Sequence, residues 1–251
     1  MDSSPSLFCI TYMPQSEDLN FPFGDDTTLD VRLEGDTATL IRQKRWISSE
    51  IEEEVARFRY SGENLIKDPE VEKAKLPPFA LAFYKFIFFK NRLPDEVEFW
   101  NYYLGQHFTA VDVQYIQFLQ KGILKKYLAE SVKARMLRSY PSLIRDFHFF
   151  VLCQESRLFE RVSYSLRDDY FKGIDLTISY QNRLFRVSVM LNSERSRAYK
   201  AQKYARHAES PENEVLMLFD LYKNANVKGQ IKLFSPRHVE ELLIELQKHK
   251  G

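Results

Sequence analysis

The spacing of the apolar residues changes near Glu155, and this change restricts the chain to a mixed fold. From Pro77 to Glu155 the apolar side chains recur every three or four residues, which is typical of amphipathic helices. After Glu155 they come in short alternating runs bounded by turn-forming residues, which is typical of strands. We therefore predict an α+β protein whose C-terminal part is an α/β domain, with a mixed sheet flanked by helices.

The C-terminal part supplies the elements of such a sheet. Strands are predicted at 159–166, 173–178, 184–191, 214–221 and 231–234. Helices are predicted at 143–153, from Asn192 to about Ala208, and from Ser235-Pro236 to Leu246. The last of these helices presents four apolar residues to the core: Val239, Leu242, Leu243 and Leu246.

The N-terminal part is predicted to begin with strands and to continue with helices. A hairpin is predicted at 28–33 and 37–41 around Gly35-Asp36. Helices are predicted at 48–59, after Pro77-Pro78, after a proline-containing start at 93–96, and at 109–128 with an interruption at Gly122. The helix after 93–96 is expected to bury Val97, Trp100, Tyr103 and Leu104. Tyr140-Pro141 is predicted to stop the helical pattern, which divides the chain into 1–138 and 139–251.

Composition narrows the classes of protein that this chain can belong to. The 251 residues carry a net charge of +1 and two cysteines, which excludes a disulfide scaffold and a thiolate zinc site. No apolar run has the length of a membrane span, and the first residues lack the character of a signal peptide. We expect a cytoplasmic protein without membrane contact. The aromatic helical region, which mainly fills the core, is a candidate surface for a protein partner.

Asp175 is the strongest candidate for a functional side chain. It stands in Gly173-Ile174-Asp175-Leu176, at the start of a predicted strand. Alternation along that strand places Asp175 with Thr177 and Ser179, on the face opposite the apolar residues. A carboxylate in this position can hold a metal ion, or it can be an ordinary turn residue, and the sequence leaves both interpretations open.

The order of the elements after residue 142 resembles the core of the PD-(D/E)xK nuclease superfamily, the restriction-endonuclease-like fold. The resemblance implies that Asp175 and a helical glutamate, here Glu155, bind Mg²⁺ for phosphodiester hydrolysis. It also implies a Glu-x-Lys motif on the third strand, where this chain has Ser188 and Met190. Neither residue can act as the expected acid or lysine, so the motif is incomplete.

The segment after the third strand could supply the missing groups. Glu194 is a candidate for the missing acid, and Lys200 or Lys203 for the missing lysine, which makes these residues catalytic candidates beside Asp175. The predicted helix also forms a basic ridge that is expected to contact nucleic acid: Arg195, Arg197, Lys200, Lys203 and Arg206. Its alternative interpretation is a solvated helix face.

Two functions remain open from the sequence. The first is a magnesium-dependent DNA endonuclease or nicking subunit of a defence, mobile-element or repair system. The second is a catalytically inactive nuclease-like fold that binds nucleic acid or serves as a structural subunit. DNA is preferred over RNA as the partner. Nucleotide-binding and serine-hydrolase motifs are absent from the sequence, and His148 and Cys153 are expected to be buried core residues.

Overall fold

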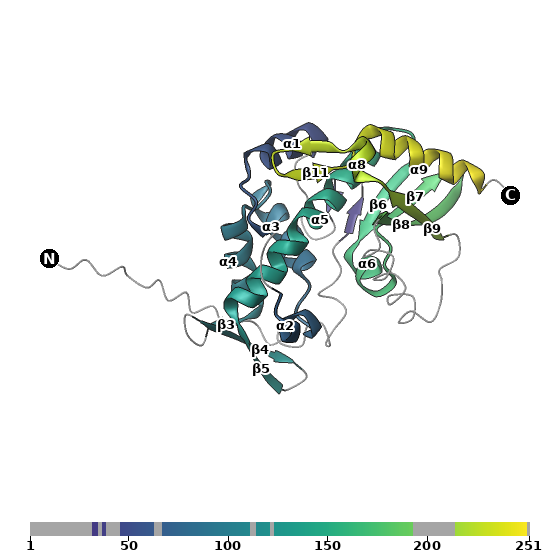
Figure 1. Cartoon of the computed structure of the whole chain (residues 1–251). Helices are drawn as coiled ribbons and strands as arrows, with labels where there is room; N and C mark the ends of the chain where they lie inside the picture. Colours follow the sequence, from purple (N-terminus) through teal and green to yellow (C-terminus); the bar gives the residue numbers. More distant parts are fainter. Residues whose placement is uncertain are drawn as a thin grey trace.

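A computed structural model describes residues 32–34, 37–38, 46–62, 67–110, 114–120, 123–192 and 214–249. It shows a six-stranded sheet in the order β2-β1-β6-β7-β8-β9, a three-stranded sheet β3-β4-β5, and the two-stranded β10-β11 (Figure 1). Helices pack around and between these sheets. The predicted α+β class and the mixed C-terminal sheet are confirmed.

The six-stranded sheet contains the first four of the five predicted C-terminal strands, whereas the fifth, at 231–234, lies in the two-stranded sheet. The members of the six-stranded sheet are β1 (Arg32–Glu34), β2 (Thr37–Ala38), β6 (Arg161–Ser165), β7 (Leu176–Tyr180), β8 (Arg183–Leu191) and β9 (Glu214–Phe219). All neighbours are antiparallel except β8 and β9, which are parallel. The described part of the N-terminal hairpin is confirmed, and β1 pairs with β6. A strand of the predicted N-terminal part therefore belongs to the C-terminal sheet.

The two faces of this sheet differ in chemistry because side chains alternate along each strand. One face is apolar and carries buried residues such as Ile178, Val187 and Phe219. Phe149 packs against Phe219 with ring centroids 5.4 Å apart. The helices of this layer are α5 (Ala129–Glu155) and α9 (Pro236–Lys248), and Figure 1 shows α6 (Leu166–Lys172) on the other side of the sheet from α9.

The last helix agrees with the prediction, and two short elements before it were not predicted. Ser235 is the N-cap of α9, and Val239, Leu242 and Leu246 are buried while Leu243 packs against the core. The unpredicted elements are α8 (Leu221–Asn224) and β10 (Asn226–Lys228), and β10 pairs with β11 (Ile231–Leu233). The additional helix α6 was also not predicted.

The predicted stop at Tyr140-Pro141 is wrong, because α5 continues through it. Pro141 lacks the N–H that would bond to the Leu137 carbonyl, which usually ends or kinks a helix. Packing compensates here: Tyr140 and Ile144 are fully buried, and the Tyr140 hydroxyl donates a hydrogen bond to the Pro94 carbonyl. Consequently α5 crosses the predicted boundary, and it contacts α1 to α4 as well as β6, β11 and α9.

The predicted helix at 109–128 is also wrong. The chain forms β3 (Thr109–Ala110), β4 (Tyr115–Gln120) and β5 (Ile123–Leu128) instead. Ile116, Phe118 and Tyr127 are the buried residues of this hairpin. Apolar residues at 113, 116, 119 and 123 fit a helical spacing, but the alternation within 115–118 fits a strand equally well. Both spacings are compatible with the sequence, and contacts with the rest of the protein favour the strand.

The remaining helices are α1 (Ser48–Arg57), α2 (Pro69–Lys73), α3 (Phe79–Lys90) and α4 (Glu96–His107). The start of α4 differs in detail from the prediction. Asp95 is its N-cap and forms a capping box with Glu98, so Pro94 precedes the cap instead of standing in the first turn. Val97, which was expected to be buried, is 62% exposed, and Phe99 is buried in the core instead.

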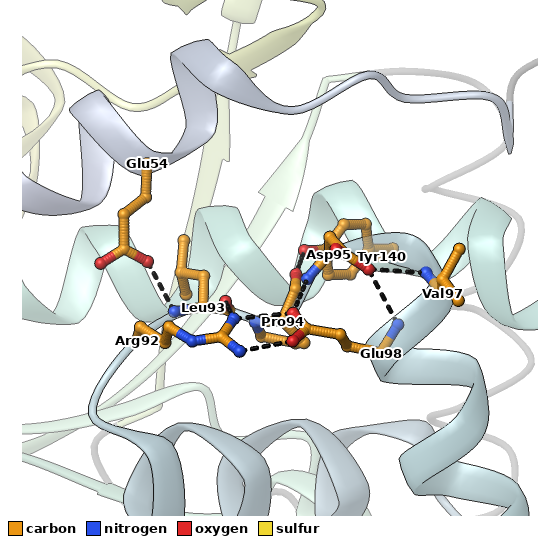
Figure 2. Close-up of polar contacts among 8 residues, drawn as sticks. All are labelled: Glu54, Arg92, Leu93, Pro94, Asp95, Val97, Glu98 and Tyr140. Carbon is orange, nitrogen blue, oxygen red and sulfur yellow. Dashed lines mark hydrogen bonds and ion pairs between the residues drawn. The ribbon is translucent and has the colours of Figure 1, made fainter.

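The turn between α3 and α4 is tied to two other helices (Figure 2). The Leu93 amide donates to Glu54 Oε2 of α1 at 2.6 Å. The Pro94 carbonyl accepts the hydroxyl of Tyr140 from α5. Arg92, which lies in the turn, donates to Glu98 Oε2 of α4 at 2.7 Å and so ties the turn to the helix that follows it. These contacts hold the N-terminal helices against α5.

In the part of the chain that the structure describes, no helix is long and apolar enough to span a membrane.

Candidate active site

Asp175 lies directly before β7 and is held against β8. Its amide donates to the Val187 carbonyl at 2.9 Å, and its Oδ2 accepts the Val189 amide at 2.6 Å. These bonds extend the β7–β8 pairing by one residue, so that Asp175 lies opposite Ser188 on the polar face. The predicted adjacency of Asp175 and the polar face of the third strand is confirmed.

Ser188 is 2% exposed and connects three elements. Its Oγ lies 2.8 Å from the Gly173 carbonyl oxygen and 2.9 Å from Glu214 Oε1. A serine hydroxyl has one proton, so it donates to one of these oxygens at a time. Gly173 ends α6 with a φ of 72°, a backbone conformation that glycine adopts at little cost. This conformation directs its carbonyl to Ser188.

Glu214 is the functional candidate that the sequence analysis missed. It opens β9 opposite Arg186 of β8, and its Oε1 reaches Ser188, two residues further along β8 on the same face. Like Asp175, it is an acid at the first residues of a largely apolar strand. That local signal was present in the sequence. The partner was not visible, because the sequence does not show that β8 and β9 pair in parallel.

A buried tyrosine pair lies beside this site. The rings of Tyr84 and Tyr164 have centroids 4.7 Å apart, and the Tyr164 hydroxyl donates to Asp169 Oδ2 at 3.2 Å. Burial raises the pKa of Tyr84 well above its ordinary value, and the negative charges of Asp146, Asp169 and Asp175 raise it further. The charges of acids from α5, α6 and the start of β7 therefore act on the same tyrosine.

Glu155, the predicted helical ligand, serves the fold. Its Oε1 accepts the Ser48 amide at 3.1 Å, and its Oε2 accepts the Ser48 hydroxyl. The carboxylate thus satisfies a free amide at the start of α1, where a negative charge is favourable. Pairing of Glu155 with Asp175 is not supported by these contacts. The α5 carboxylate whose charge acts together with that of Asp175 is Asp146.

The other predicted site residues lie outside the described residues. They are Glu194, Arg195, Arg197, Lys200, Lys203 and Arg206. Their assignment as catalytic or nucleic-acid-binding residues stays a prediction, as does the helix that was expected to carry them.

The oxygen atoms around Ser188 suit a hard cation. Asp175 and Glu214 contribute carboxylates, Ser188 a hydroxyl and Gly173 a carbonyl. Mg²⁺ is commonly held by one or two carboxylates together with water and substrate oxygens. Within the described ranges, no group of three His, Cys, Asp or Glu side chains forms a metal-binding arrangement. The fit therefore rests on two carboxylates and neutral oxygen donors.

A second polar cluster lies between α1, α5 and β10. His148 is fully buried, as predicted, and its Nε2 lies 3.2 Å from Glu52 Oε1. Asn226 Nδ2 donates to the same oxygen at 2.7 Å, and Lys228 Nζ lies 3.0 Å from Glu52 Oε2. Burial lowers the pKa of His148, although Glu52 acts in the opposite direction. Cys153 is buried as predicted, and burial raises the pKa of its thiol, so it is no nucleophile.

Comparison with protein-family models, with curated proteins and with solved structures gives no match. The resemblance to the PD-(D/E)xK superfamily therefore remains a prediction from the sequence.

Proposed function

We propose that this chain is a nucleic-acid-processing protein, a metal-dependent DNA endonuclease or nicking subunit. The observation that carries the proposal is that Asp175, bonded to the Val189 amide, lies opposite Ser188 on the mixed sheet, while Glu214 contacts the Ser188 hydroxyl. Bound Mg²⁺ would neutralise charge on a phosphodiester and acidify a water molecule. Asp175 and Glu214 would hold it, and the backbone bonds to β8 would keep Asp175 in a fixed orientation.

A specific observation also favours a second function, a nuclease-like fold without catalysis. Ser188 occupies the position at which the resembled motif has an acid, and its hydroxyl is bonded within the sheet. Met190 occupies the position of the lysine. A protein of this kind would bind nucleic acid or a partner subunit without cleaving it.

The experiment that separates these functions measures cleavage and binding in parallel. Labelled DNA, labelled RNA and supercoiled plasmid are incubated with Mg²⁺ or Mn²⁺, and Asp175→Asn is the control because it removes the charge and keeps the shape. Cleavage by the parent that is lost in Asp175→Asn supports the endonuclease. Binding without cleavage supports the inactive nuclease-like fold. Absence of both cleavage and binding contradicts the endonuclease and any nucleic-acid-binding role, and leaves only a structural subunit.

A further inference from the structure

The β4–β5 hairpin has one face fixed to the rest of the protein. Ile116, Phe118 and Tyr127 are buried on this face. The Phe118 ring lies between those of Phe108 and Tyr127, with centroid distances of 5.3 and 6.0 Å. Aromatic contacts of this kind stabilise the hairpin and give it a defined orientation.

The end and the opposite face of the hairpin are exposed. Ile123 and Leu124, directly after the connection between the strands, are each 59% exposed. On the face opposite the buried residues, Lys126 is exposed and its Nζ lies 3.9 Å from the centroid of the Tyr115 ring. Figure 1 shows β4 and β5 at the base of α5, apart from the six-stranded sheet. Leu124 and Lys126 therefore lie together on the exposed face, whereas Ile123 and the half-buried Lys125 are on the face of Tyr127.

The charge of this segment indicates the partner. Between Gln114 and Ala129 the sequence has three lysines and no acidic residue, whereas the whole chain has a net charge of +1. Two of these lysines, Lys125 and Lys126, lie on β5. A cluster of one sign of charge on a nearly neutral protein attracts a polyanion.

We propose that the β4–β5 hairpin is a nucleic-acid contact, in which Lys125 and Lys126 bind phosphates and Ile123 and Leu124 pack against sugars or bases. Lysines that neutralise phosphates provide sequence-independent affinity. Exposed apolar side chains on such elements insert at base steps and widen or kink the duplex. The inference rests on the proposed function and assigns a binding surface to it outside the carboxylate site.

The helix α5 leads from this hairpin toward the six-stranded sheet (Figure 1). It begins at Ala129, directly after β5, and carries Asp146, whose charge acts on Tyr84 together with that of Asp175. The 17 residues between Ala129 and Asp146 correspond to a rise of about 25 Å. Nucleic acid that touches both places must extend over about 8 base pairs at 3.4 Å each. The hairpin should therefore contribute to binding only on longer substrates.

The test combines salt dependence and substrate length. Binding of the full chain to stem-loop duplexes of about 6 and about 24 base pairs is measured by fluorescence anisotropy across salt concentrations. With the long duplex, Lys125→Ala with Lys126→Ala should reduce the slope of log affinity against log salt by about 1.8, two phosphates at 0.9 each. Ile123→Ser with Leu124→Ser should weaken binding and leave the slope unchanged. The short duplex should show neither effect.

The matched control is Lys223→Ala with Lys248→Ala, which removes two exposed lysines from α8 and α9 and should leave the slope unchanged. Thermal unfolding of every variant should be close to that of the parent, since Ile123, Leu124 and Lys126 are exposed and Lys125 is only half-buried. If the parent binds or cleaves DNA but the hairpin variants have the parental slope and affinity, the inference is wrong and the proposed function stands. If the parent neither binds nor cleaves nucleic acid, both are wrong. Hairpin-dependent binding to anionic vesicles without binding to DNA would also overturn the inference.

Discussion

The protein contains two polar clusters whose carboxylates have different surroundings. In the cluster around His148, Glu52 has the Lys228 ammonium 3.0 Å from one oxygen, and His148 and Asn226 bind the other. In the candidate active site, Asp175 accepts a backbone amide and Glu214 contacts a hydroxyl. A carboxylate matched by a nearby cation stabilises the fold. Asp175 and Glu214, at the starts of two strands, are instead the carboxylates that are proposed to hold a cation.

The largest effect on the cleavage rate is expected from neutralising Glu214, the carboxylate that the sequence analysis missed. Glu214→Gln keeps the size of the side chain and should reduce metal-dependent cleavage by at least about 100-fold, since even partners outside the ligand sphere can cost that much. The thermal midpoint should stay close to that of the parent. Cleavage rates at saturating Mg²⁺ are compared with those of Glu240→Gln, which alters an exposed acid on α9. Full activity in Glu214→Gln would remove the carboxylate pair from the mechanism.

The opposite pattern is expected for the other cluster. Glu52→Gln leaves Lys228 and the buried His148 without their anionic partner and should destabilise the fold by about 1.5–3 kcal/mol. Activity per folded molecule should not change, because the cluster lies away from the β7–β8–β9 edge. Urea unfolding gives the free energy. Glu53→Gln is the matched control: it loses only an exposed ion pair with Arg57 at 3.6 Å and should cost less than about 0.5 kcal/mol.

A smaller effect is expected at the hydroxyl that connects the site. Ser188→Ala removes the contacts to Gly173 and Glu214 and leaves both carboxylates in place. Loss of such a positioning group should raise the Mg²⁺ concentration required for half-maximal cleavage by about tenfold, or about 1.4 kcal/mol. Ser163→Ala on β6 is the control, because its hydroxyl makes one long contact, 3.4 Å to the Thr177 carbonyl. Equal Mg²⁺ dependence in both variants would make Ser188 a packing residue.

The parts of this fold that the sequence predicted are those that local signals determine. The strands β6 to β9 alternate with period two and are bounded by turn residues, and Gln181 and Asn182 between β7 and β8 have the positive φ values of a tight hairpin turn. Asp175 could be predicted because an acid followed a glycine at a strand start. Its position beside Ser188 followed from the short connection between the two strands.

The parts that the sequence did not predict depend on contacts between distant residues. The hydrogen bond from Tyr140 to Pro94 joins residues far apart in the chain, and it lies next to the proline that was expected to end the helix. Glu214 approaches Ser188 only because β8 and β9 pair in parallel. Glu155 accepts two hydrogen bonds from Ser48, a partner that lies far from it in the sequence.

The last prediction concerns the pH dependence of the stability of the fold, to which the cluster around His148 contributes. Burial is the main cause that lowers the pKa of His148 in the folded protein, with Lys228 in the same direction and Glu52 and Glu155 opposed. As the pH falls below about 6.5, His148 is therefore protonated in the unfolded chain before it is protonated in the folded protein, and the fold loses stability. The pKa of Glu52 is lowered despite its burial, because the bonds from Lys228 and His148 outweigh it. Its contribution is lost only at lower pH, below about 4.5.

Replacing His148 by Gln should reduce the loss of stability between pH 7.5 and pH 5.5, although it lowers the stability itself. Part of the dependence should remain, because burial also lowers the pKa of His238. Urea midpoints at the two pH values measure the effect, and His249→Gln, at an exposed position next to the end of α9, is the control. The same replacement should leave the pH dependence of cleavage unchanged, since His148 does not contact the carboxylate site. A changed cleavage profile would connect the two clusters and contradict the separation between a cluster that stabilises the fold and a site that is proposed to bind a cation.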